Sequence, residues 1–147
     1  MELKNFGSVL NFAAELEASD GEFYQCAARN PACQSCKDLF EGLSIEHRQN
    51  EQRILRVRRE NVTEMILEPL KDFTRTPFVL ECAGADRLDF KEVLKTARRL
   101  EARSEHYYRE AAEKLEALPE VMGELKRIGK KHAVHGEILR ELSASPS

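Results

Sequence analysis

Apolar residues recur every three or four positions in four stretches of the chain, the spacing that places them on one face of an α-helix. The four stretches are residues 3–29, 40–57, 90–115 and 121–142. Asn30-Pro31 ends the first stretch and Pro119 separates the third from the fourth, because proline and the residue before it disfavour helix. No alternation typical of strands competes with these patterns, so the sequence predicts an all-α protein.

The helical period is lost between about residues 61 and 88, where prolines and glycine interrupt the chain. This segment still carries Phe73, Phe78, Val79 and Leu80, which we expect to be covered by the helices. It is long enough to hold a short helix or strand. We interpret it as a long crossover between two helical hairpins.

The two hairpins resemble each other. Leu16-Glu17-Ala18 recurs 84 residues later as Leu100-Glu101-Ala102, and Phe23-Tyr24 recurs at the same offset as Tyr107-Tyr108. In the second and fourth helices, His47 and Asn50 match His132 and His135 at an offset of 85. These matches indicate an internal duplication.

Four helices connected by a short loop, a long crossover and a second short loop have the connectivity of a ferritin-like four-helix bundle. We therefore predict one ferritin-like domain over residues 1–147, with hairpins at about 3–60 and 88–143. Its 147 residues suffice for one buried core.

Polar residues occupy the faces that should form this core. They are Glu17, Asp20, Tyr24, His47, Asn50, Glu101, Ser104, Tyr108, His132 and His135. One unpaired buried polar group costs about 1–3 kcal/mol, so these side chains must satisfy one another or bind something. Two carboxylates and three imidazoles suit a transition metal, and His132 and His135 at i and i+3 share one helix face.

The sequence accordingly predicts a metal site at Glu17, His47, Glu101, His132 and His135, holding one or two ions. Asn50 and Asp20 are weaker candidates: Asn50 is equally suited to hydrogen-bond a ligand, and Asp20 to face solvent. The alternative is a metal-free bundle in which glutamates and histidines form buried salt bridges.

Leu-Glu followed seven residues later by Tyr, in both the first and the third helix, resembles the rubrerythrin and ferritin-like di-iron superfamily. The resemblance covers both hairpins. It implies that Glu17 and Glu101 are metal ligands and that Tyr24 and Tyr108 pack against or hydrogen-bond to the ligands.

The chain departs from that family in the second and fourth helices, where the family carries Glu-x-x-His. His47 and His132 replace both bridging glutamates, and only His135 retains the family's histidine. Shifting the second helix by one residue would recruit Glu46 and Gln49, but it would abandon the apolar face. We therefore expect a site without a carboxylate bridge rather than the usual di-iron centre.

The resemblance implies a metal-binding protein, with iron favoured over zinc or copper, and an oxidoreductase that acts on peroxide or dioxygen. An electron-donor protein and a second copy of the chain are the partners it implies. The alternative function is a non-catalytic bundle that has lost the di-iron site and acts through its surface or as a dimer.

Cys33 and Cys36 form a C-x-x-C pair close to the start of the second helix, where a helix N-terminus can lower a thiol pKa. A redox pair and an incidental pair remain alternatives. The net charge of −3 gives no case for nucleic acid, and no apolar run is long enough to cross a membrane. The first residues lack the pattern of a signal peptide, so we expect a cytoplasmic protein.

Overall fold

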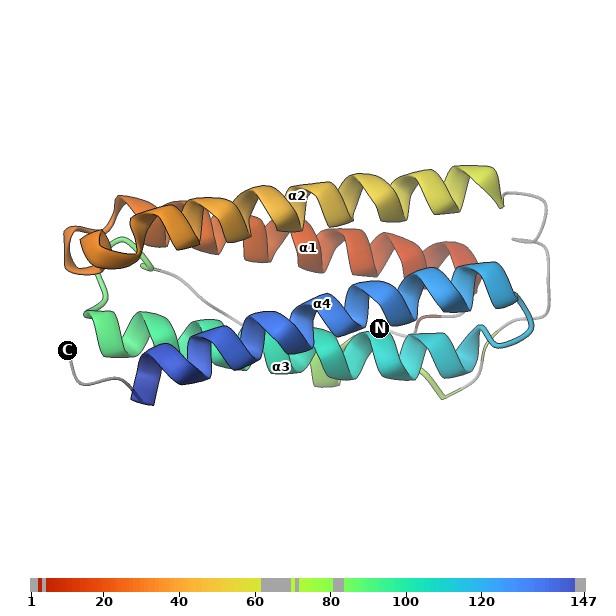
Figure 1. Ribbon diagram of the computed structural model, residues 1–147. Coiled ribbons are helices and arrows are strands. Elements are labelled where there is room, and N and C mark those ends of the chain that lie inside the picture. Colours follow the sequence, from red (N-terminus) through yellow and green to blue (C-terminus); the bar gives the residue numbers. More distant parts are fainter. Residues whose placement is uncertain (1–2, 4, 62–69, 71, 81–83, 145–147) are drawn as a thin grey trace.

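The chain folds into an all-α four-helix bundle, as the sequence predicts (Figure 1). The computed structural model describes every residue except 1–2, 4, 62–69, 71, 81–83 and 145–147. Its α-helices are α1 (Phe6–Arg29), α2 (Lys37–Glu60), α3 (Phe90–Lys114) and α4 (Pro119–Ala144). The described residues also include two short 3-10 helices, η1 (Pro31–Cys36) and η3 (Thr76–Phe78). Helices α1 and α2 form one hairpin and α3 and α4 form the other.

Short polar side chains define where the helices begin. The side chain of Asn5 accepts a hydrogen bond of 2.8 Å from the Ser8 backbone, and Ser8 accepts one of 3.1 Å from the Asn5 backbone. This reciprocal capping box satisfies two amide groups at the start of α1 that have no partner within the helix. Asp89 caps α3 with one such bond, accepting from the Glu92 backbone at 2.8 Å.

Buried Asn30 ties the two hairpins together at one end of the bundle. Its amide donates to the carbonyls of Ala85, at 2.9 Å, and Leu88, at 2.6 Å, just before α3. Its side-chain oxygen accepts from the Ala32 backbone at 2.9 Å. The residue that ends α1 thus also positions the start of α3.

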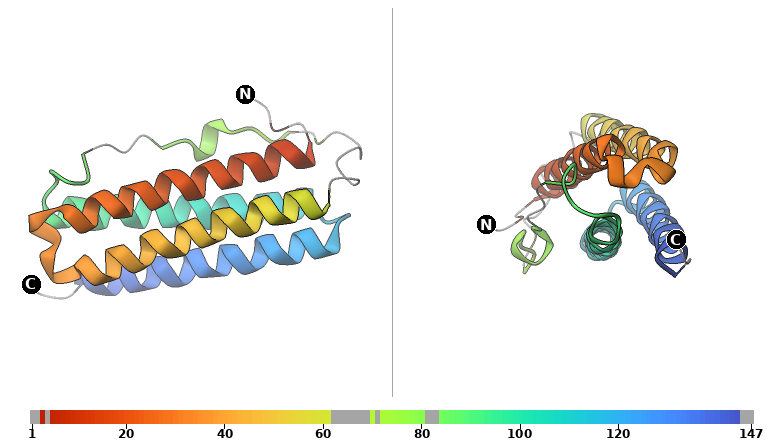
Figure 2. Two further views of the ribbon diagram at one scale, coloured as in Figure 1. Left: turned by 90° about the horizontal axis from the view of Figure 1, so that it is seen from above. Right: turned by 90° about the vertical axis from the view of Figure 1, so that its left-hand side faces the viewer.

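Within the connection between the hairpins, the described segment that contains η3 lies beside α1 and α3 (Figure 2). Phe73 and Phe78 are buried as expected, and their rings lie 5.5 and 5.0 Å from the ring of Tyr107. The expectation for Val79 is wrong: it is 55% exposed. Val79 follows η3, whose turn directs Phe78 inward, so only one of the two adjacent residues reaches the bundle.

The apolar core is divided into two clusters along the bundle. One contains Leu10, Leu16, Tyr108 and Leu125, and the other contains Phe23, Phe40, Leu94 and Leu139. Between these clusters, near the middle of the four long helices, lies a layer of buried polar side chains. The core polar residues of the sequence therefore meet in one place.

A candidate metal centre in the bundle

Each of the four helices contributes to the polar layer. The candidate ligands are Glu17 from α1, His47 from α2, Glu101 from α3, and His132 and His135 from α4. Four of them have no exposed surface and His135 is 4% exposed. The structure therefore brings together all five residues that the sequence singled out as metal ligands.

His132 lies between the two glutamates. Its Nε2 is 2.6 Å from Oε2 of Glu17, and its Nδ1 is 2.8 Å from Oε2 of Glu101. The two glutamates are far apart in the sequence, and each belongs to a different hairpin. One imidazole thus connects the halves of the internal repeat.

His47 presents a free ring nitrogen to the centre of the layer. Its Nδ1 lies 2.7 Å from the carbonyl oxygen of Leu43, which can only accept, so Nδ1 carries the proton. Its Nε2 lies 3.0 Å from Oε1 of Glu101, but this buried nitrogen has no partner in hydrogen-bond geometry. The Leu43 carbonyl thus orients the imidazole, and Nε2 offers a lone pair to a metal once it gives up its own proton.

His135 repeats this arrangement from α4. Its Nε2 is 3.0 Å from Oε2 of Glu46, a half-buried carboxylate at the edge of the site. Its buried Nδ1 is 3.4 Å from Oε2 of Glu101 and has no hydrogen-bond partner among the described residues. Metal-binding histidines usually donate their second nitrogen to a carbonyl or carboxylate, as His47 and His135 are placed to do.

The two tyrosines of the repeat bond to the glutamate of the opposite hairpin. Tyr24 on α1 donates to Glu101 at 3.1 Å, and Tyr108 on α3 donates to Glu17 at 2.6 Å. Asn50 donates to the other oxygen of Glu17 at 3.1 Å. Tyr24, Tyr108 and Asn50 thus each donate a hydrogen bond to a candidate ligand.

Charge is balanced within this layer. Burial alone would raise the pKa of Glu17 and Glu101, but His132 and its neighbours outweigh burial and keep both below the ordinary value. Burial alone would lower the pKa of His47, but Glu101 and Glu17 raise it to about 9. The same glutamates, Glu17 first, hold the pKa of His132 well above its ordinary value against burial. Without a metal, two protonated imidazoles therefore neutralise two carboxylates.

Four of the five residues can converge on one ion. One nitrogen each from His47, His132 and His135 and one oxygen of Glu101 all lie within 4.8 Å of one another. Imidazole and carboxylate are donors for zinc, iron and copper, and a divalent cation would supply the two positive charges that the protons supply otherwise. The residues fit a transition metal ion.

Asp20 is engaged elsewhere. Its carboxylate accepts two hydrogen bonds from the guanidinium of Arg103, at 2.5 and 2.7 Å, and one of 3.2 Å from Ser104. Arg103 also donates to the Phe78 carbonyl at 3.0 Å. The sequence prediction missed Arg103, although an arginine next to Ser104 on the inner face of α3 is a signal that could have revealed it.

Glu46, which the sequence analysis rejected together with the shifted register of α2, lies at the edge of the site. The structure confirms the chosen register of α2, because His47 and Asn50 are buried and Glu46 is not. Nevertheless Glu46 reaches across to His135 on α4. A long side chain at the edge of the buried face of a helix can thus reach a site with its terminal carboxylate.

The C-x-x-C pair lies in η1, at the end of the bundle, and its two thiols are free. Cys33 is buried, and burial, followed by the neighbouring Cys36, raises the pKa of its thiol. This is the opposite of the lowering expected for a thiol at a helix start. The geometry thus disfavours a reactive thiolate at Cys33.

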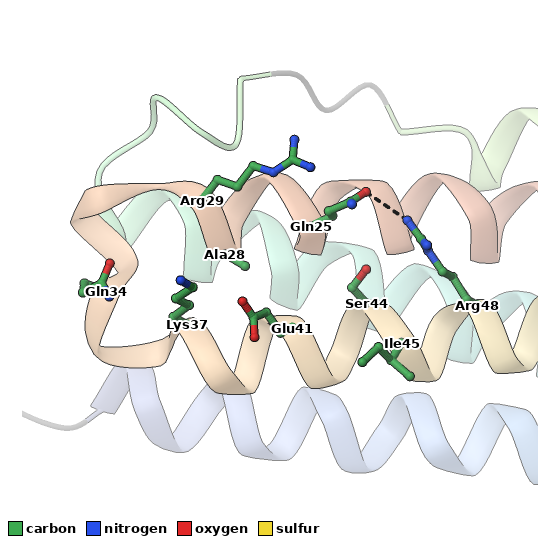
Figure 3. Close-up of a pocket in the computed structure, with 9 residues that line it drawn as sticks. All are labelled: Gln25, Ala28, Arg29, Gln34, Lys37, Glu41, Ser44, Ile45 and Arg48. Carbon is green, nitrogen blue, oxygen red and sulfur yellow. Dashed lines mark hydrogen bonds between the residues drawn. The ribbon is translucent and has the colours of Figure 1, made fainter.

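A hollow of about 460 Å³ on α1 and α2 lies apart from the polar layer (Figure 3). Arg48 donates to Gln25 across it at 3.0 Å, and Arg29 and Lys37 lie farther along. None of the five candidate ligands lines this hollow. It is a surface feature separate from the candidate metal centre.

Comparisons with protein-family models, curated proteins and solved structures gave no match for this chain. Among the described residues, no helix combines the length and apolar character needed to cross a membrane. The site's own geometry therefore carries the functional argument.

Proposed function

We propose that this protein binds a transition metal ion in the middle of its helical bundle. The ligands are His47, Glu101, His132 and His135, and Glu17 is the adjacent donor that completes or adjusts the set. One ion per chain is the stoichiometry that these four converging donors favour.

The observation that carries this proposal is a pair of buried ring nitrogens, Nε2 of His47 and Nδ1 of His135, that have no hydrogen-bond partner within the described part of the chain. A buried polar atom without a partner costs about 1–3 kcal/mol. Both atoms lie near the same carboxylate, and the other nitrogen of each ring faces an acceptor. A cation bound among them removes both costs at once.

The surrounding residues orient the donors. Tyr24 and Asn50 each bond to one oxygen of a glutamate, Glu101 and Glu17 respectively, and so restrict how these carboxylates rotate. Leu43 and Glu46 fix the ring orientations of His47 and His135. The apolar clusters on both sides keep bulk water from the layer.

Iron is the metal that the resemblance to rubrerythrins favours, with zinc and copper as alternatives. A redox-active ion would supply one-electron chemistry and make the protein an oxidoreductase acting on peroxide, dioxygen or another small oxidant. In that case an electron-donor protein is required, and a homodimer is the assembly we propose from the same resemblance.

The second candidate is a bundle that keeps the fold and acts without metal. One observation favours it: both ring nitrogens of His132 already face carboxylates, so protons alone can satisfy this imidazole. In this case the cluster is a buried network of ion pairs, and the protein acts through its surface.

Metal content per chain separates the two candidates. Wild-type protein purified without chelator, and refilled with iron, zinc or copper, should hold about one ion by elemental analysis. His47→Ala and His132→Ala should lose that ion, because each removes one of four donors. Chelation should lower the melting temperature of the wild type but not that of the variants.

His106→Ala is the matched control. His106 is an exposed histidine that pairs with Glu110 on the same helix, at 3.2 Å, and it is no part of the polar layer. It should retain the metal. A wild type that takes up no ion, and melts identically with and without chelator, would establish the metal-free candidate instead.

A further inference from the structure

A groove of about 440 Å³ lies between α3 and α4, with His132 among its lining residues. We call it the α3/α4 groove. His132 itself has no exposed surface. The groove therefore brings solvent up to the wall of the candidate metal centre without exposing it.

Small residues form that wall. Ala102, Ala133 and Gly136 line the α3/α4 groove. A Cβ atom added to Gly136 would lie 3.9 Å from Cβ of Glu101, so the two helices approach closely beside this candidate ligand. The wall between the groove and the polar layer is therefore thin, because it is made of these small residues and the candidate ligands.

Positive charge surrounds the α3/α4 groove. Lys95, Arg98 and Arg99 line it from α3, and within the described residues none of the three has an ion pair or a hydrogen bond. Arg140 is neutralised by Glu137, which leaves Glu105 as the single further carboxylate on the lining. Lys95 and Arg99, four residues apart on one helix, repel each other, an arrangement that favours a bound anion.

The hollow on α1 and α2 lacks this combination. It also carries cations, including Arg29 and Lys37, but no candidate ligand lines it (Figure 3). In the α3/α4 groove, cations without a partner and a candidate ligand meet on one surface. Such a concave, positively charged surface raises the local concentration of anions.

We propose that the α3/α4 groove guides small inorganic anions to the ion held in the bundle. The exogenous ligand or substrate is then a small anion rather than neutral peroxide or dioxygen. This inference rests on the proposed metal-binding function and narrows its substrate class.

Azide is the probe for this proposal, and the cobalt(II)-loaded full chain supplies the signal. Cobalt content is first measured by elemental analysis. Azide binding is then followed by the visible absorption of cobalt in a stopped-flow instrument. We expect Arg98→Glu with Arg99→Glu to slow azide association about tenfold at low ionic strength, and the difference to shrink near 1 M salt, where the Debye length is about 3 Å. Imidazole, a neutral ligand at alkaline pH, should bind both proteins at the same rate.

The matched control changes the same amount of charge elsewhere. Arg29→Glu with Lys37→Glu acts at exposed positions on the other hollow and should leave azide association unchanged. Ala102→Phe, also at an exposed position, should narrow the groove and slow azide and imidazole alike.

The outcomes separate this proposal from the one it rests on. Cobalt-loaded protein that binds imidazole but not azide overturns the anion proposal and leaves metal binding intact. Equal slowing by the control pair, or none by the Arg98 and Arg99 pair, overturns the groove as the route. A chain that takes up neither cobalt nor iron, zinc or copper overturns both proposals.

Discussion

Asp20 on α1 and Arg103 on α3 form a buried ion pair in which one nitrogen, Nη2 of Arg103, lies 2.5 and 2.7 Å from the two carboxylate oxygens. It links the two hairpins one helical turn from the candidate ligand Glu17 and two residues from Glu101. A hydrogen bond between two charged groups is stronger than a neutral one. The other nitrogens of Arg103 bond to Ser104 and to the Phe78 carbonyl, so this pair restricts how α1 and α3 face each other.

Removing one partner of this pair should destabilise the fold strongly. Asp20→Asn or Arg103→Met leaves a buried charge without its partner, and we expect a loss of about 3–5 kcal/mol in unfolding free energy by urea denaturation. A double variant with apolar residues at both positions, Asp20→Leu with Arg103→Met, should lose much less. Single and double variants of equal stability would contradict a coupled pair.

Two glycines of α4 should respond oppositely to alanine. At Gly129 the new Cβ would lie 3.1 Å from Cβ of Tyr108, an atom next to the backbone of α3, so the helices must move apart. Overpacking should destabilise the fold by about 1–3 kcal/mol, which exceeds the stabilisation of about 1 kcal/mol that alanine gives a helix relative to glycine. Gly129→Ala should therefore lower the melting temperature.

Gly123→Ala is the matched control on the same helix. No atom of the described residues lies within 4 Å of its added Cβ, so only the gain in helix propensity remains. We expect stabilisation by about 0.5–1 kcal/mol in the same thermal melts. Stabilisation by both substitutions would show that α3 and α4 are not in close contact at Tyr108.

The ion pair between Arg53 on α2 and Glu124 on α4 should make stability depend on pH in acid. A hydrogen bond from Arg53 holds the pKa of Glu124 below its ordinary value of 4.5. The folded state thus favours the charged form, and its stabilisation is complete above about pH 4.5 and is lost as the pH falls through the lower folded pKa. The pair is partly exposed, so its contribution is about 1 kcal/mol or less.

Urea denaturation of the wild type and Glu124→Gln tests this dependence. The wild type should be more stable by that small amount at neutral pH, and the difference should vanish in strong acid. A difference that grows as the pH falls would contradict the predicted sign.

Cys33 should react slowly with iodoacetamide. It is buried and its thiol pKa is raised, so little thiolate is available in the folded protein. Labelling followed by mass spectrometry should detect modification of half-buried Cys36 before Cys33. Preferential labelling of Cys33 would revive the hypothesis of a redox pair.

The repeat in the sequence anticipated the arrangement of the tyrosines only in part. Matching Glu17 with Glu101 and Tyr24 with Tyr108 placed each pair on equivalent helices. It did not reveal that each tyrosine bonds to the glutamate of the other hairpin, because the crossing of α1 and α3 depends on how the hairpins pack.

The sequence by itself determined the four helices and placed the candidate ligands on the helix faces that point into the bundle. The helical period can be read from neighbouring residues alone, and a charged residue at an apolar position of that period is easily recognised. The register that buries His47 and Asn50 followed from the same local pattern, and so did the choice against Glu46 as a core residue.

Only the tertiary structure decided which atoms meet. Asp20 faces Arg103 rather than the candidate metal centre, and Glu46 reaches His135 from outside the apolar face of α2. Val79 points outward although it is apolar. Each of these outcomes depends on a neighbour distant in sequence, since long side chains such as arginine and glutamate find partners that no local period describes.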